Sequence, residues 1–140
     1  MSELVELLAC ETCGGAERAS HGSARGERLI ELLKSASRAR GETQVAVASV
    51  RCLWLCKRSC AVHVRGGGRV GYLLAELEAS EEAASALLDY AALYRRSSDG
   101  AVPYREWPQA LRGHFVCRVP APPDHAVTPS SASEAREEQT

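Results

Sequence analysis

The pattern of apolar and polar positions predicts a chain in which strands and helices alternate. Apolar residues recur at helical spacing over residues 27–39 and again after Ser80, which suits a helix N-cap. Short apolar runs predict four strands, at residues 4–8, 44–50, 61–64 and 70–74. The expected order is β-α-β-β-β-α, an α/β fold with a small mixed sheet.

The segments rich in glycine and proline mark the ends of these elements. Three glycines at residues 66–68 predict a hairpin turn, because no helix follows them as a phosphate-binding loop would require. A helical turn is expected at residues 108–111 and an edge segment at 115–119. After Pro120 the chain is rich in Pro, Ala, Ser and Glu. We therefore expect one domain over residues 1–120 and a disordered tail over 121–140.

Composition agrees with one globular domain that needs no disulfides. The chain has 140 residues, of which 45% are hydrophobic and 25% charged, and its net charge is −1. This balance gives no sign of nucleic acid or a membrane surface as a partner. The acidic N-terminal residues do not resemble a signal peptide, and no stretch is long enough to span a membrane. The expected compartment is the cytoplasm, where thiols stay reduced.

Five of the six cysteines fall into two groups. Cys10 and Cys13 form a C-x2-C pair, whereas Cys52, Cys56 and Cys60 occur within nine residues. In a reducing compartment such groups favour metal or redox chemistry over disulfides. The remaining cysteine, Cys117, stands alone and is expected to be a small buried apolar residue.

The expected topology brings the two groups together. Residues 4–8, the first helix and residues 44–50 form a β-α-β unit, which joins parallel strands by a right-handed crossover. Cys10 is expected just after the first strand and Cys52 just after the second. Because the carboxyl ends of parallel strands lie at one edge of the sheet, the two cysteine loops should converge there.

The converging thiolates are suited to an inorganic centre. Cys10, Cys13, Cys52 and Cys56 supply the four sulfur ligands that a [2Fe-2S] cluster or a structural zinc ion takes, and spacing does not separate these two. Cys60 has the same spacing to Cys56 and is an alternative ligand. Thiol-disulfide exchange by the C-x2-C pair is less favoured because no helix directly follows it. The fourth interpretation is that these cysteines have only a structural role.

Residues around the second cysteine group add a weak preference for electron transfer. Arg51, Lys57 and Arg58 form a basic group on a nearly neutral chain, which would stabilise a reduced cluster or steer an acidic partner. Trp54 between two candidate ligands would shield the site or belong to the core. His63, in the middle of a predicted strand, is expected to be structural.

These residues also resemble a known family. The chain resembles the DUF1636 family of predicted metal-binding proteins and, more broadly, the thioredoxin-like [2Fe-2S] ferredoxins. The segments that carry the resemblance are Cys10-Glu11-Thr12-Cys13, Arg51-Cys52-Leu53-Trp54-Leu55-Cys56-Lys57-Arg58-Ser59-Cys60, residues 87–94 and residues 99–108.

The resemblance implies a thioredoxin-like ferredoxin fold with one cluster on Cys10, Cys13, Cys52 and Cys56. Those ferredoxins space their first two cysteines further apart than C-x2-C, so Cys60 stays open as a substitute. The expected function is a non-enzymatic electron carrier with a protein redox partner. Related ferredoxins often form homodimers, so the resemblance also implies a homodimer. The resemblance also implies a link to cobalamin synthesis. The alternative is a non-redox protein that holds zinc or handles cobalt.

Overall fold

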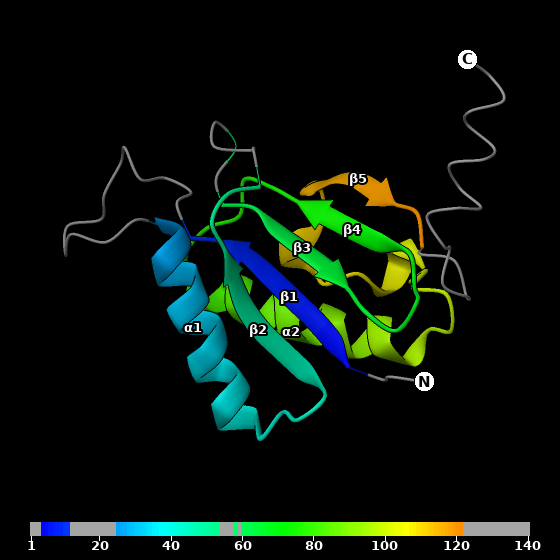
Figure 1. Ribbon diagram of the computed structural model, residues 1–140, viewed down its shortest axis with the longest axis horizontal. Coiled ribbons are helices and arrows are strands. Elements are labelled where there is room, and N and C mark those ends of the chain that lie inside the picture. Colours follow the sequence, from blue (N-terminus) through cyan, green and yellow to red (C-terminus); the bar gives the residue numbers. More distant parts are fainter. Residues whose placement is uncertain (1–3, 12–24, 54–57, 59, 122–140) are drawn as a thin grey trace, which may run out of the picture.

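A computed structural model describes residues 4–11, 25–53, 58 and 60–121 (Figure 1). In chain order its elements are β1 (Val5–Cys10), α1 (Arg25–Arg40), β2 (Val45–Val50), β3 (Val62–Arg65), β4 (Gly71–Leu74), α2 (Glu81–Arg96), the 3-10 turns η2 (Tyr104–Glu106) and η3 (Gln109–Leu111), and β5 (Phe115–Val119). The predicted strands and helices are all present, with small shifts at their ends. Within the described residues, no helix is long and apolar enough to cross a membrane.

The strands form one mixed sheet in the order β2-β1-β3-β4-β5. β1 pairs with β2 in parallel, as the β-α-β prediction requires, and β1 pairs with β3 in the antiparallel direction. The β3–β4 and β4–β5 pairs are antiparallel as well. β1 is therefore an interior strand whose two neighbours both come later in the chain.

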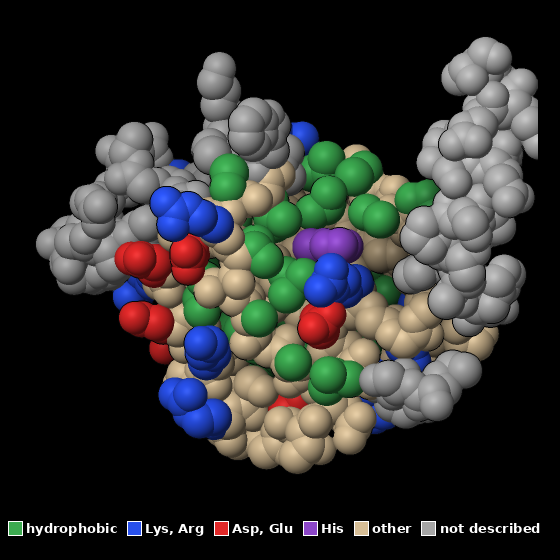
Figure 2. All heavy atoms as spheres, viewed as in Figure 1, with side chains coloured by type: hydrophobic (Ala, Val, Ile, Leu, Met, Phe, Trp, Pro, Cys, Tyr) green, Lys and Arg blue, Asp and Glu red, His purple; other side chains and the backbone are tan. Residues whose placement is uncertain are grey.

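Both helices pack on the same face of this sheet. The main core joins alternate residues of β1, such as Val5, Leu7 and Ala9, to Leu29 and Leu33 of α1 and to several residues of α2. In Figure 1, α2 runs behind the strands and α1 lies beside β2. The opposite face carries no helix within the described residues. Figure 2 shows that hydrophobic side chains gather over the strands on this open face.

Local signals explain where the helices begin and end. The Ser80 side chain accepts a hydrogen bond from the Ala83 amide at 3.2 Å, so it caps α2 as predicted. α1 ends at Arg40, and the next residue, Gly41, has a φ of +66° and donates its amide to the Arg38 carbonyl, which forms a left-handed C-cap. Pro108 precedes η3 as its N-cap residue and is not its first residue.

The C-terminal strand corrects one prediction. The edge segment at residues 115–119 is a true strand, β5, and it pairs with β4. Cys117 on this strand is exposed, whereas the sequence predicted a buried residue. The reason is that β5 lies at the edge of the sheet, and Cys117 pairs with Leu73 on the face that no helix covers.

Candidate metal centre

Cys10 lies within the first strand rather than in a loop after it. β1 continues to Cys10, which pairs with Val50, the last residue of the parallel strand β2. The predicted end of the strand before Cys10 was therefore too early. The Cys10 side chain is fully buried, and its thiol donates a weak hydrogen bond to the Arg51 carbonyl at 3.8 Å. Cys10, the start of the first cysteine group, thus lies beside Arg51, the residue that precedes Cys52.

Cys52 follows the end of β2 by two residues and is exposed. The next residue, Leu53, packs against Cys10 and Ala61 in a small apolar cluster. This cluster is separate from the main core and covers the Cys10 sulfur. The predicted convergence of the Cys10 and Cys52 segments at one edge of the sheet follows from the β1–β2 register.

Cys60 approaches the same edge from the third strand but points to the other face. Its backbone pairs with that of Leu77 through two hydrogen bonds of 3.1 Å, and its side chain belongs to the main core under the helices. Burial raises the pKa of the Cys60 thiol, an effect that Arg25 partly opposes and Cys10 adds to. Cys10 is equally buried, so what separates the two thiols is the face of the sheet: Cys60 lies in the main core under the helices, and Cys10 in the small cluster with Leu53.

Other predicted members of the site lie outside the described residues, namely Cys13, Cys56, Trp54 and Lys57. In the part of the chain that the structure describes, no three His, Cys, Asp or Glu side chains form a group able to hold a metal ion. The described residues therefore supply two cysteines, Cys10 and Cys52, at the predicted edge.

The predicted basic group is partly neutralised. The Arg58 guanidinium makes an ion pair with Glu76, in which Nε and Oε2 are 2.9 Å apart. The Glu76 amide also donates to the Arg58 carbonyl at 2.8 Å, so backbone and side chain fix this contact together. Sequence position alone could not reveal this partner, because Glu76 lies beyond the β3–β4 hairpin.

The donor set at this edge fits a thiophilic centre. Cysteine sulfur suits zinc and iron-sulfur clusters, whereas Mg²⁺ and Ca²⁺ prefer oxygen ligands. Cys10 lies under apolar cover, and Cys52 faces solvent. A centre held by these two thiols would have one sheltered side and one accessible side.

The fold and this edge define a small mixed α/β protein that carries cysteines at the carboxyl ends of two parallel strands. Residues 7–121 match the family described as "Protein of unknown function (DUF1636)", and the chain belongs to that family. No curated protein and no solved structure matches the chain.

Proposed function

We propose that the protein binds one [2Fe-2S] cluster through Cys10, Cys13, Cys52 and Cys56 and passes single electrons to a protein partner. The observation that carries this proposal is the parallel register in which Cys10 pairs with Val50. That register brings the start of each predicted cysteine pair to the same sheet edge, although about 40 residues separate them in the chain.

The sheet supports the finer fold proposed with this function. A β-α-β unit followed by a β-β-α unit, with strand order β2-β1-β3-β4 and both helices on one face, fits a thioredoxin-like ferredoxin. β5 extends this arrangement by one strand. In this proposal the finer fold name depends on the strand order and on the sequence resemblance together.

The residues around this edge of the sheet would have different roles in such a site. A bound [2Fe-2S] cluster supplies one-electron redox chemistry. Leu53 and Ala61 exclude water from the Cys10 side, which lowers the local dielectric constant. Cys52 lies on the solvent side, where a partner can approach. The Arg58–Glu76 pair neutralises one of the cations beside this approach.

The direct test is the visible absorption spectrum of protein purified without oxygen, together with iron, zinc and acid-labile sulfide analysis. A [2Fe-2S] protein should be red-brown, contain about two iron and two sulfide per chain, and bleach with dithionite. A colourless protein that takes up no cluster on reconstitution but holds about one zinc would reject electron transfer. It would leave the non-redox metal-binding alternative.

Substitution of single cysteines tests the ligand assignment. Cys52→Ser should lose most of the iron and the visible absorption, because serine is a poor substitute for a thiolate ligand. Cys117→Ser is the matched control, since Cys117 is also exposed but lies on β5, the edge strand on the other side of the sheet. Iron analysis and absorption spectra measure both. Full cluster content in Cys52→Ser would remove Cys52 from the ligand set.

A further inference from the structure

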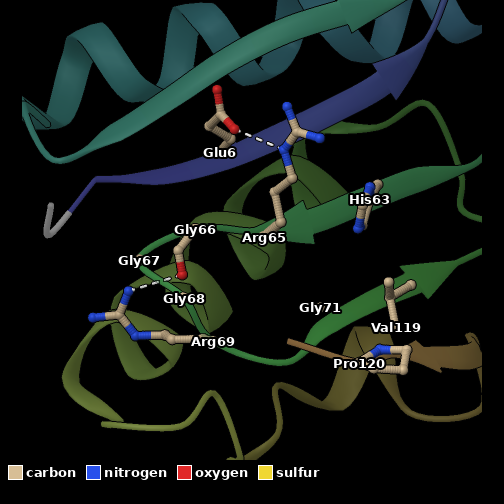
Figure 3. Close-up of a pocket in the computed structure, with 10 residues that line it drawn as sticks. All are labelled: Glu6, His63, Arg65, Gly66, Gly67, Gly68, Arg69, Gly71, Val119 and Pro120. Carbon is tan, nitrogen blue, oxygen red and sulfur yellow. Dashed lines mark hydrogen bonds and ion pairs between the residues drawn. The ribbon is translucent and has the colours of Figure 1, made fainter. Parts of the chain in front are cut away.

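The sheet has a second feature, a hollow beside the start of β1, at the opposite end of that strand from Cys10. It lies among the start of β1, the end of β3, the glycine turn at residues 66–68 and the end of β5 (Figure 3). Its volume is about 360 Å³, which is within the range of small-molecule pockets. Because it lies at the opposite end of β1 from Cys10, it is separate from the candidate metal centre.

Arg65 gives this hollow a cationic group with unused hydrogen-bond donors. Its Nε makes an ion pair with Oε1 of Glu6 at 2.7 Å, across the β1–β3 pair. Among the described residues, none accepts a hydrogen bond from the two terminal nitrogens of Arg65. The side chain is 52% exposed, so these nitrogens remain accessible. They form the fork that binds a carboxylate with two parallel hydrogen bonds.

A second arginine holds the floor of the hollow in place. Arg69 is buried, and its guanidinium donates to the carbonyls of Gly66, Arg95 and Ser97 at 2.7–3.1 Å. These bonds tie the glycine turn to the C-terminal end of α2, where a positive charge is favourable. Arg69 thus adds positive charge but has little hydrogen-bonding capacity left for a ligand. Two arginines against Glu6 leave the lining with a net positive charge.

The remaining walls are neutral or apolar. Burial and the nearby Arg65 lower the pKa of His63, so its imidazole is uncharged at neutral pH. Its Nε2 packs beside Gly71, where an added Cβ would come within 3.0 Å of that nitrogen. Val119 and Pro120 form an apolar wall on the β5 side (Figure 3).

We propose that this hollow binds a small organic carboxylate with a short apolar chain. The carboxylate takes the place of Glu6 on Arg65, whose guanidinium turns from Glu6 (Figure 3) toward the hollow, and the apolar chain then packs against Val119 and Pro120. The arrangement recognises an anion by its charge and fork geometry, and the apolar wall selects an organic anion over an inorganic one.

Two substitutions of the same ion pair should act in opposite directions. Arg65→Gln removes the cation and the fork, so carboxylate affinity should fall about tenfold or more. Glu6→Gln removes the competing carboxylate and releases Arg65, so affinity should rise severalfold. Both variants lose the same Glu6–Arg65 ion pair, so a purely structural effect would move the affinity in one direction. Arg40→Gln, which breaks the exposed Arg40–Asp89 pair between the helices, is the control.

The measurement is an NMR titration of the full ¹⁵N-labelled chain with sodium butyrate, sodium formate and sodium chloride. Butyrate should shift the amides of Gly66, Gly67, Gly68 and Gly71 in a saturable way. It should bind at least about fivefold more tightly than formate, because its chain buries apolar surface. Chloride at the same ionic strength should give no saturable shift.

Several results would overturn the proposal. Equal shifts with butyrate and chloride would show that the hollow has no carboxylate site. Equal affinity for formate and butyrate would exclude the apolar wall from recognition. Affinity that falls in both Arg65→Gln and Glu6→Gln would show that the ion pair only supports the fold. These readouts require no metal content, so they are independent of the proposed cluster.

Discussion

Two buried tyrosines of α2 illustrate how much a single hydroxyl depends on its partner. Tyr90 and Tyr94 are both fully buried, and their ring centroids lie 6.2 Å apart. The Tyr94 hydroxyl donates to the Val70 carbonyl at 2.6 Å. The Tyr90 hydroxyl is buried without a hydrogen-bond partner among the described residues. Two tyrosines one helical turn apart therefore differ in whether their buried hydroxyl is hydrogen-bonded.

Phenylalanine substitutions should separate these two cases. Tyr94→Phe removes a made hydrogen bond and leaves the Val70 carbonyl without that donor, so the free energy of unfolding should fall by about 1–2 kcal/mol. Tyr90→Phe removes only an unsatisfied buried hydroxyl, so stability should stay within about 0.5 kcal/mol or increase. Urea unfolding followed by circular dichroism measures both. A larger loss in Tyr90→Phe than in Tyr94→Phe would contradict this account.

The limits of sequence reasoning are also visible in single residues. The position of Cys10 and Cys52 at one edge followed from strand direction alone. The core position of Cys60 was also expected, whereas the face of Cys10 was not, because the first strand was predicted to end before that residue. Once β1 includes Cys10, that residue takes the open face, whereas Cys60 joins the core under the helices. Strand ends predicted from sequence are uncertain by a few residues, and this uncertainty placed Cys10 in a loop and not in the strand.

Helices whose ends are set by nearby residues were predictable from the sequence. Strands that depend on pairing with distant segments were less predictable. α2 has its cap at Ser80, and Gly41 ends α1. β5 was predicted only as an edge segment, because its apolar residues do not alternate strictly with polar ones and its partner β4 lies about 40 residues earlier. The hollow beside Arg65 could not be predicted either, since it requires β5 to lie next to β4.

The β3–β4 turn offers a test at this scale. Gly67 and Gly68 have φ of +65° and +73°, and Arg69 donates its amide to the Gly66 carbonyl at 3.2 Å. Two central residues with positive φ define a type I′ hairpin turn, which favours glycine. A Cβ at Gly66 would lie only 2.4 Å from the Leu4 carbonyl oxygen, whereas one at Gly68 would meet nothing within 4 Å.

Alanine at these two glycines should have unequal costs. Gly68→Ala pays only for its left-handed backbone, about 1 kcal/mol. Gly66→Ala must also move β1 away from the turn, so we expect a loss of about 3 kcal/mol or more. Urea unfolding at neutral pH measures the difference. Equal losses would mean that the close approach of Leu4 to the turn does not constrain the fold.

The molecule as a whole should lose stability at alkaline pH. Burial raises the pKa of Tyr94 to about 12 and that of Tyr90 further above its ordinary value. Both tyrosines are protonated in the folded state at pH values where the unfolded chain already releases those protons. Their contribution is complete below about pH 10 and is lost as pH rises through the folded pKa values.

The slope of this loss can be measured. Each tyrosine should lower the free energy of unfolding by about 1.4 kcal/mol per pH unit between about pH 10 and 12. Urea unfolding at several pH values in this range gives the slope, and Tyr90→Phe or Tyr94→Phe should each reduce it. Tyr104→Phe, at an exposed position, should leave the slope unchanged. An unchanged slope in both core variants would show that other groups govern alkaline unfolding.

The interior place of β1 has a consequence for the chain during its synthesis. β1 is translated before the other described strands, its residues are mostly buried in the finished sheet, and its partners β2 and β3 follow much later. The gap of about 40 residues to β2 takes a ribosome about 2–8 s at 5–20 residues per second. Much of the ribosomal exit tunnel is filled by such a length of chain, so β1 emerges before any strand can cover it. Among the described strands, β1 is thus the one that waits longest for the strands that cover it.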